Sequence, residues 1–298
     1  MNNLLMEVKK ILSSHKVRLH KRLGQNFLID EEVIYKIIEA AEINSQDLIL
    51  EVGSGIGILT EQLALHSNKV IAVEIDPQLV SILRERFENR RNVCIINGNI
   101  LHIDLDEILG NCTQAKVVTN LPYYITTPII MHLLKKRNRF KSLIIMVQKE
   151  VGERILASPK SKDYGVLSIG VQYASDQRLI AHVSRKSFFP PPSVDSMVIK
   201  LTVLQEPKVS VSNQDMFFRV VEVSFQKRRK MIRNSLTDLG IAKGVLIKLL
   251  SSLDIDSKRR PETLSIQEFA CLSNSLTREV LEQECDVTMV GNGRRRSL

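Results

Sequence analysis

Short apolar runs alternate with amphipathic helical segments over the first 150 residues of this 298-residue chain. The runs have the length and two-sided apolar character of strands buried in a parallel sheet: Asp47–Val52, Val70–Ile75, Val93–Ile96, Lys116–Thr119 and Ser142–Val147. Between them, Asp30–Ile43 places its apolar residues on one helical face, and Asp76-Pro77 and Thr127-Pro128 are typical helix starts. This alternation predicts a doubly wound α/β sheet.

The pattern changes after Lys200, where a polar, turn-rich stretch is followed by helical patterns only. The predicted helices are Met216–Phe225, Arg229–Leu239, Ala242–Leu250 and one that begins near Ser265. We therefore expect an α/β domain over residues 1–203, with an N-terminal extension over 1–29 that includes a short amphipathic helix. A linker over 204–215, a smaller all-helical domain over 216–285 and a disordered tail over 286–298 follow.

Composition excludes several classes of protein. Hydrophobic residues make up 44% and charged residues 25%, which is ordinary for a globular chain and argues against wholesale disorder. No apolar run approaches the ~18 residues that span a bilayer, and the N-terminus has no signal-peptide core. We expect no metal site and reduced thiols in a cytoplasmic protein, because no CxxC pair or metal-ligand spacing links the cysteines Cys94, Cys112, Cys271 and Cys285.

The net charge favours a polyanionic partner. Lys and Arg exceed Asp and Glu by 42 − 33 = 9. Five cations fall within residues 227–233: Lys227, Arg228, Arg229, Lys230 and Arg233. Such a run can bind RNA phosphates, and the alternative is an ordinary solvated helix face.

A glycine-rich loop marks a candidate cofactor site. Gly53-Ser54-Gly55-Ile56-Gly57 follows a predicted strand and precedes a predicted helix, and its glycines let the backbone approach a ligand closely. The dinucleotide fingerprint requires glycine where this chain has Ile58, which disfavours an NAD-dependent dehydrogenase. Glu74 ends the second predicted strand, where an acid can accept hydrogen bonds from two ribose hydroxyls.

Polar residues follow the next two strands as well. Asn99 comes after the third strand, where a contact to a base edge would fall, and the tetrapeptide Asn120-Leu121-Pro122-Tyr123 follows the fourth. Because the carboxyl ends of parallel strands meet at one sheet edge, these residues and the glycine-rich loop are expected to form a single site.

Six motifs in order resemble one family, the ribosomal RNA adenine N6,N6-dimethyltransferases of the KsgA type, over about residues 18–275. They are KRLGQNFL at Lys21–Leu28, EVGSGIG at Glu51–Gly57, NLPY at Asn120–Tyr123, FFPPPSVDS at Phe188–Ser196, FQKRRKMIRNSL at Phe225–Leu236 and RPETLSIQEF at Arg260–Phe269. The resemblance implies a Rossmann-like class I methyltransferase domain that depends on S-adenosylmethionine, with a smaller all-helical C-terminal domain that binds RNA.

The resemblance also implies a set of cofactor contacts: Asn26, Leu28, Gly53, Gly55, Glu74, Asn99 and Asn120. The family usually has Asp where this chain has Asn99. An amide keeps an acceptor oxygen but loses the charge-assisted strength of a carboxylate. We therefore expect Asn99→Asp to leave cofactor affinity equal or tighter.

The reaction that the resemblance implies must activate a poor nucleophile, the adenine N6 amine. Its lone pair is delocalised into the ring, so two acceptors aimed at its hydrogens would favour a tetrahedral nitrogen. Asn120 Oδ1 and the backbone carbonyl of Leu121 or Pro122 are the candidates. Tyr123 would stack on the extruded base and Phe188 would cover its other face, the alternative for both rings being core packing.

The expected activity is dimethylation of two adjacent adenosines in small-subunit ribosomal RNA within an assembling subunit, by a cytoplasmic monomer with no membrane contact. One alternative is a resistance-type enzyme that methylates large-subunit RNA. The helical C-terminal motifs and the KRLGQNFL start favour the small subunit. A non-enzymatic RNA-binding factor on a methyltransferase fold is a second alternative, and the intact NLPY and EVGSGIG motifs argue against it.

Overall fold

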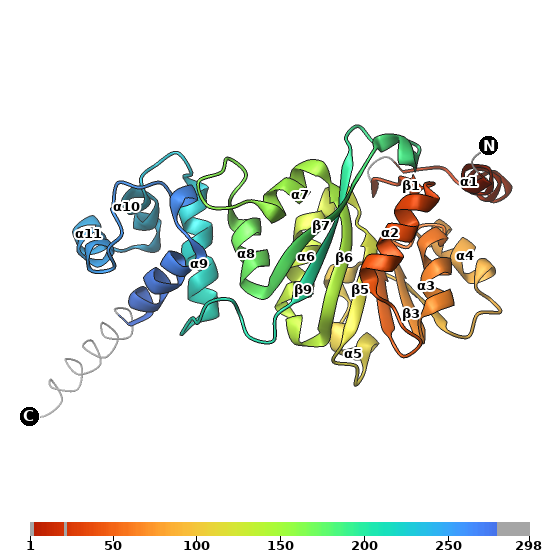
Figure 1. Ribbon diagram of the computed structural model, residues 1–298, viewed down its shortest axis with the longest axis horizontal. Coiled ribbons are helices and arrows are strands. Elements are labelled where there is room, and N and C mark those ends of the chain that lie inside the picture. The colour runs from red at the N-terminus through yellow and green to blue at the C-terminus, as the bar shows by residue number, and fades with distance from the viewer. Residues whose placement is uncertain (1–2, 21–22, 279–298) are drawn as a thin grey trace, which may run out of the picture. The chain divides into compact units, whose positions relative to one another are not determined.

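The computed structural model describes residues 3–20 and 23–278, which group into two compact units (Figure 1). Unit 1 contains Met1–Leu156 and Ala174–Glu206, and unit 2 contains Ala157–Tyr173 and Pro207–Leu298. The sequence-based division assigned residues 157–173 to the first domain, whereas these residues belong to unit 2, where Tyr173 stacks on Phe217 with ring centroids 5.2 Å apart. The expected tail, 286–298, and Cys285 lie outside the described residues.

A seven-stranded sheet forms the centre of unit 1, with helices on both faces (Figure 1). Its order is β4-β3-β2-β5-β6-β9-β7. The strands are β2 (Leu48–Val52), β3 (Lys69–Glu74), β4 (Val93–Asn97), β5 (Ala115–Asn120), β6 (Phe140–Gln148), β7 (Ser175–Val183) and β9 (Ser196–Val203). The first five are parallel, whereas β9 runs antiparallel to both β6 and β7. The α/β prediction is confirmed, and the antiparallel pair at the edge extends it.

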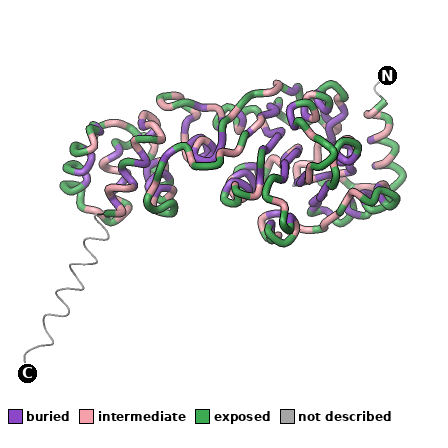
Figure 2. The backbone as a smooth tube through the Cα atoms, turned by 60° about the horizontal axis from the view of Figure 1, so that its bottom comes forward, coloured by how far each residue is buried: buried purple, intermediate pink, exposed green. Residues whose placement is uncertain are grey.

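The helices of unit 1 are α1 (Asn3–Ser14), α2 (Glu31–Ala41), α3 (Ile58–His66), α4 (Pro77–Arg86), α5 (Leu105–Leu109), α6 (Thr126–Lys135) and α7 (Lys149–Leu156). Two of them, α2 and α4, begin at the predicted caps, and α6 begins at Thr126, one residue before the predicted Thr127-Pro128 start. Asp30 caps α2 by accepting from the Glu32 and Val33 amides, and Asp76 caps α4 by accepting from Gln78, with proline at the first helical position. Buried residues line the inner faces of these helices and the strands (Figure 2).

A separate two-stranded ribbon pairs β1 (Phe27–Leu28) with β8 (Phe188–Phe189) in antiparallel register, Phe27 opposite Phe189 and Leu28 opposite Phe188. It joins two of the sequence motifs that lie 160 residues apart, KRLGQNFL and FFPPPSVDS. Two-residue strands are too short to be recognised from local pattern, because their pairing depends on the surrounding fold.

Unit 2 is helical in its described part. It contains α8 (Val166–Ala174, whose last residue belongs to unit 1), α9 (Gln214–Gln226), α10 (Ile232–Ser235), α11 (Lys243–Ser252) and a helix over residues 266–278. The predicted helix Arg229–Leu239 is formed only in part. Residues 229–231 are not helical, and helical structure begins at Ile232, as α10 followed by a 3-10 helix over Leu236–Leu239. The Ile232 amide, at the start of α10, donates to the Arg259 carbonyl at 2.7 Å, a partner 27 residues away that the local pattern could not reveal.

Candidate active site

One pocket opens at the carboxyl ends of β2, β3 and β5, where an open α/β sheet places its ligands. Segments from four motif or strand-end regions line it, including residues 23–28, 53–56 and 120–124 together with Glu74. Six of the residues expected to bind cofactor therefore lie around a single pocket: Asn26, Leu28, Gly53, Gly55, Glu74 and Asn120.

The glycine-rich loop has no room for side chains. Gly53 and Gly55 have φ values of +75° and +60°, a region that disfavours other residues. A Cβ on Gly53 would lie 3.3 Å from Pro122 Cδ, and one on Gly55 would lie 3.2 Å from the Phe27 ring. The loop therefore packs directly against both the NLPY and KRLGQNFL motifs. Its amides are engaged within the protein: Gly53 donates to the Val73 carbonyl and Gly55 to the Glu74 carboxylate.

Glu74 is held rigidly at the end of β3. One carboxylate oxygen accepts from the Gly55 amide at 2.8 Å, and the other accepts from the Ile75 and Asp76 amides at 2.9 Å. Burial raises the pKa of Glu74, and these backbone donors act against that shift. The result is a fixed acceptor that points along the wall of the pocket.

Asn120 presents an acceptor that the protein itself leaves unused. Its Nδ2 donates to the Asn26 carbonyl at 3.3 Å, which orients the amide. Its Oδ1 is buried and finds no partner among residues 3–20 and 23–278. An unpaired buried acceptor costs about 1–3 kcal/mol. A ligand that donates a hydrogen bond here would recover that cost.

The turn after Asn120 is fixed by its own backbone bonds. The Leu121 amide donates to Met146 at 3.0 Å, and the Pro122 carbonyl accepts from the Ile125 amide and the Thr126 hydroxyl. Of the two carbonyls considered from the sequence, that of Pro122 is thus already engaged twice. This favours the Leu121 carbonyl as the second acceptor for an incoming amine.

The aromatic residues of the motifs occupy different environments. Tyr123 lines the pocket, and its hydroxyl lies 2.6 Å from Ser196 Oγ, which joins NLPY to FFPPPSVDS. Tyr124 also lines the pocket and is 46% exposed. Phe188, expected to cover a base, is 2% exposed and does not line this pocket. It pairs with Leu28 and supports the pocket wall from behind, because the ribbon turns its ring into the core.

Asn99 lies beside the main pocket. It lines a neighbouring small pocket together with Gly53, Pro122 and Tyr124. Its Oδ1 accepts from the Leu101 amide at 3.1 Å and so caps the following short helix. The residue is therefore close to the predicted cofactor contacts, and its side chain also has a local structural role.

Glu51, the first residue of EVGSGIG, lines the pocket and was not identified as a site residue from the sequence. It is 2% exposed and accepts a 2.5 Å hydrogen bond from the Thr60 hydroxyl. Burial raises the pKa of Glu51 to about 8. The sequence signal that could have identified Glu51 is an acidic residue two positions before the glycine-rich loop. The burial of its carboxyl group became apparent only in the folded structure.

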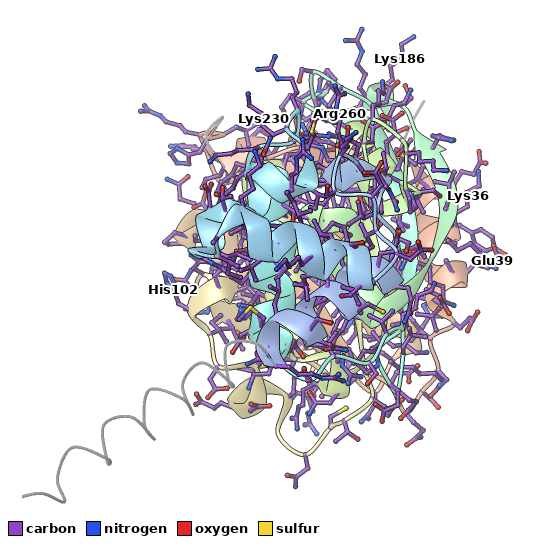
Figure 3. All side chains as sticks on the ribbon, turned by 90° about the vertical axis from the view of Figure 1, so that its left-hand side faces the viewer. Lys36, Glu39, His102, Lys186, Lys230 and Arg260 are labelled. Atoms are coloured by element: carbon purple, nitrogen blue, oxygen red, sulfur yellow. The ribbon has the colours of Figure 1, made fainter. Side chains whose placement is uncertain are left out.

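The basic run of unit 2 is only partly available to a partner. Arg229 and Lys230 are exposed (Lys230 is labelled in Figure 3). Lys227 lies 2.7 Å from Asp238, whereas Arg228 is half-buried and donates to the Ser161 carbonyl. Arg233 is also half-buried. Two of the five predicted RNA contacts, Arg229 and Lys230, are therefore exposed and form no ion pair with any residue that the structure describes.

Neither a metal centre nor a membrane span emerges from the described residues. No group of three or more His, Cys, Asp or Glu side chains within 3–20 and 23–278 is arranged to hold a metal ion. Within the same ranges, no helix has the length and apolar character needed to cross a membrane.

Comparison with protein families matches residues 16–278 to the family described as ribosomal RNA adenine dimethylase. A Clostridium botulinum (strain Kyoto / Type A2) protein named ribosomal RNA small subunit methyltransferase A is 48% identical over 271 residues. The match covers 91% of this chain and 98% of that protein.

Two solved structures are similar over most of their length. A dimethyladenosine transferase from Plasmodium falciparum matches with a TM-score of 0.70 and 28% identity, over 83% of this chain and 95% of that one. The 23S rRNA methyltransferase ErmE matches with a TM-score of 0.63 and 25% identity, over 83% and 98% of the respective chains.

Proposed function

This chain belongs to the ribosomal RNA adenine dimethylase family, and from that membership we propose that it dimethylates N6 of two adjacent adenosines in small-subunit ribosomal RNA during subunit maturation. The observation that carries the proposal is Asn120 Oδ1, a buried acceptor without a partner in the described chain at the pocket where the motifs meet. We further propose that the enzyme acts as a cytoplasmic monomer.

S-adenosylmethionine fits the residues of this pocket. Its amino-acid end would lie on the Gly53–Gly55 backbone, whose glycines allow Pro122 and the Phe27 ring to pack closely, and Glu74 would accept from the ribose hydroxyls. Glu74 places a carboxylate at the wall of the pocket, whereas Glu51, whose pKa burial raises to about 8, is mostly neutral at pH 7. Asn26 and Leu28 would complete the wall, and Asn99 would contact the adenine edge. When bound, this cofactor supplies an electrophilic methyl group.

The chain's own task is to present the adenine amine. Asn120 Oδ1 and the Leu121 carbonyl accept from the two N6 hydrogens and draw the nitrogen toward tetrahedral geometry. As positive charge develops on the nitrogen, these fixed dipoles stabilise it without reorganisation. No strong base is required, because the proton leaves after the nitrogen has become cationic. Most of the acceleration comes from alignment of the amine with the methyl group.

The target base must leave its stack to reach Asn120. Tyr123 provides a ring at the pocket, and its hydrogen bond to Ser196 fixes the plane on which a base would stack. Such stacking contributes about 1–3 kcal/mol per base. Pro122 fixes the turn, and Phe188 supports the wall behind Leu28 instead of touching the base.

The small subunit is favoured over the large one as substrate. The relative named for small-subunit RNA is 48% identical over 91% of the chain, whereas the 23S methyltransferase ErmE is 25% identical over 83%. The difference in identity, not the site geometry, supports the assignment.

The decisive experiment supplies labelled cofactor and purified enzyme to undermethylated small and large ribosomal subunits and then maps the modified bases. We expect two adjacent dimethylated adenosines in small-subunit RNA and none in large-subunit RNA. Transfer to the large subunit alone would support the resistance-type alternative. Binding without any transfer would support a non-enzymatic factor. Stabilisation by S-adenosylhomocysteine but not by NAD in a thermal-shift assay tests the cofactor independently of RNA.

A further inference from the structure

We propose that the N-terminal helix α1 is a clasp that positions the cofactor-facing wall of the pocket, with Arg86 as the positioning residue that holds it. α1 covers Asn3–Ser14, whereas the family match begins at residue 16. The helix thus lies outside the segment that the family model matches. The inference rests on the proposed function only in taking the pocket to bind S-adenosylmethionine.

Arg86 joins three helices through one guanidinium group. Its Nη2 lies 2.8 Å from Glu7 Oε1 on α1 and 3.0 Å from Glu61 Oε2 on α3, while Arg86 itself ends α4. The Arg86 side chain is only 17% exposed. A partly buried cation shared by two carboxylates fixes geometry more strongly than an exposed pair does.

Two further contacts hold α1 along its length. Val8 is fully buried and Leu12 is 8% exposed, and both belong to the apolar cluster that contains Phe27 and Leu28. At the end of the helix, His15 Nε2 lies 3.0 Å from Glu85 Oε2, and its Nδ1 lies 2.9 Å from the Ile11 carbonyl. Apolar burial therefore joins α1 to the cluster that contains Phe27 and Leu28, and polar contacts join it to the end of α4.

The contact with the cofactor site runs through the β1–β8 ribbon. Lys9 Nζ on α1 lies 5.3 Å from the centroid of the Phe189 ring, within cation–π range. Phe189 pairs with Phe27, whose ring lies against Gly55 of the cofactor loop. Gln25, in the segment between α1 and the ribbon, donates to Asp76 at 2.7 Å.

The ribbon needs such external support. Strands of two residues make too few hydrogen bonds to hold their own position. Yet this ribbon and the preceding turn carry Asn26 and Leu28, two of the predicted cofactor contacts. If packing of α1 stabilises the ribbon in its cofactor-binding position, α1 raises the affinity for cofactor. Because such coupling is reciprocal, bound cofactor must stabilise the packed position of α1 to the same extent.

The test measures S-adenosylhomocysteine affinity by calorimetry in Arg86→Gln, Glu7→Gln and Lys9→Gln, with Lys36→Gln as the matched control. Lys36 forms an exposed ion pair with Glu32 on α2 and is labelled in Figure 3. We expect Arg86→Gln to weaken S-adenosylhomocysteine binding about tenfold, and Glu7→Gln and Lys9→Gln to weaken it about threefold. Arg86→Lys should recover most of the lost affinity, and the affinity of the Lys36→Gln control should be unchanged.

Two readouts separate positioning from mere stability. The KM for S-adenosylmethionine should rise in Arg86→Gln while the KM for RNA and kcat stay within about twofold. Hydrogen exchange of the α1 amides should slow when S-adenosylhomocysteine binds to the wild type, and this protection should be lost in Glu7→Gln. Lower melting temperatures with unchanged affinity and no α1 protection would overturn the proposal.

The three variants protect the test against misfolding. If Arg86→Gln fails to fold, Glu7→Gln and Lys9→Gln still test the proposal, because each removes one contact of α1 at an exposed or half-buried position. The calorimetric measurement requires no methyl transfer. A wild type that binds S-adenosylhomocysteine but methylates nothing would refute the proposed function and leave this inference standing.

Discussion

At Asn120 the chain keeps a polar atom buried and unused, at the position where the motif resemblance placed the acceptor for the substrate amine. The neighbouring Asn26 carbonyl orients its amide, so that Nδ2 is occupied and the buried Oδ1 has no partner among the described residues, at a residue that lines the pocket. The residue combines a fixed orientation with an unpaired acceptor, which is the arrangement that electrostatic catalysis requires.

Replacing Asn120 by Ala should lower kcat by about 10²–10³-fold, the range typical of removing one preorganised dipole. RNA affinity should stay within about twofold, because the basic residues lie elsewhere in the chain. Single-turnover methyl transfer and filter binding measure the two quantities. A loss of RNA binding equal to the loss of rate would instead indicate that Asn120 acts in substrate capture.

The burial of Glu51 should make the stability of the folded chain depend on pH. Its folded pKa of about 8 lies above the ordinary value of 4.5. The stabilising contribution of its neutral form is therefore complete below about pH 4.5 and is lost as pH rises through 8. Wild type should lose stability relative to Glu51→Gln across this window, by up to about 5 kcal/mol.

Urea unfolding of wild type and Glu51→Gln between pH 5 and pH 9 tests this. The amide keeps an acceptor for Thr60 and cannot ionise, so only the slope with pH should differ. Parallel stability curves over the whole range would show that Glu51 does not titrate in this window.

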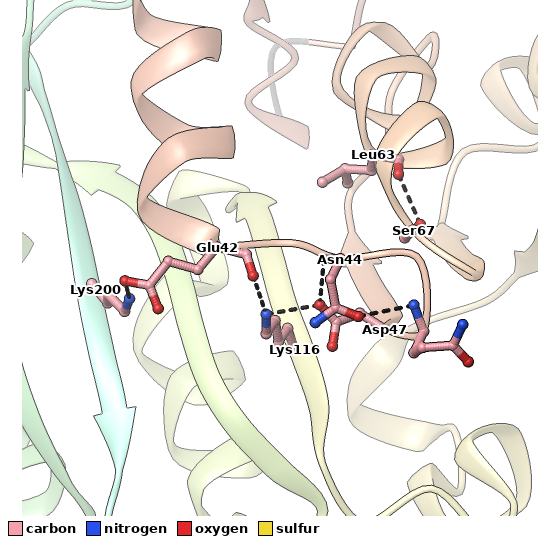
Figure 4. A network of polar contacts seen from close by, with 8 residues as sticks. Glu42, Asn44, Asp47, Leu63, Ser67, Lys116 and Lys200 are labelled. Atoms are coloured by element: carbon pink, nitrogen blue, oxygen red, sulfur yellow. Dashed lines mark hydrogen bonds and ion pairs between the residues drawn. The ribbon is translucent and has the colours of Figure 1, made fainter.

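Among the elements, β5 depends on a polar network at the end opposite the pocket (Figure 4). Lys116, near the start of the strand, is 2% exposed and donates to Asp47 Oδ2 at 2.8 Å and to the Glu42 carbonyl at 2.6 Å. Glu42 also pairs with Lys200 of β9. One buried ammonium group thus joins both ends of the loop between α2 and β2 to the strand that carries Asn120.

Lys116→Met should lower the free energy of unfolding by about 3–5 kcal/mol, because it leaves a mostly buried Asp47 carboxylate without its cation. Lys36→Met removes an exposed ion pair on α2 and should cost less than about 0.5 kcal/mol. Chemical denaturation compares the two variants. Equal effects would mean that the burial of Lys116 contributes nothing beyond a surface pair.

At the scale of the whole molecule, the net charge of +9 is not itself a binding surface. Within the run at 227–233, ion pairing engages Lys227 and burial limits Arg228 and Arg233, so Arg229 and Lys230 offer the most accessible charge. Counting cations in the sequence therefore overestimates how many are available to bind phosphate.

The double variant Arg229→Gln/Lys230→Gln should weaken RNA binding. It should also reduce the magnitude of the slope of log K against log salt by about 1.5, because each lost phosphate contact lowers that slope by about 0.7–0.9. Lys227→Gln, which removes a cation already paired with Asp238, should change the slope by less than half a unit. Binding titrations at several salt concentrations distinguish them. An unchanged slope in the double variant would place the phosphate contacts elsewhere.

The sequence by itself determined the parallel strands, the helix starts at Asp30 and Asp76, and the glycine-rich loop with Glu74 and Asn120 around one pocket. These features follow from residues within a few positions of one another, since apolar periodicity, capping and glycine turns are local. The parallel-sheet rule then gathers the strand ends at one edge.

Only the tertiary structure decided which side chains are buried or paired. Phe188 turned into the core behind Leu28, residues 157–173 joined unit 2, and the helix predicted from Arg229 began only at Ile232, whose amide bonds to Arg259. The clasp at Arg86 likewise depends on Glu7, 79 residues away. Such outcomes depend on partners distant in the chain, because burial and ion pairing are decided where segments meet and not by local pattern.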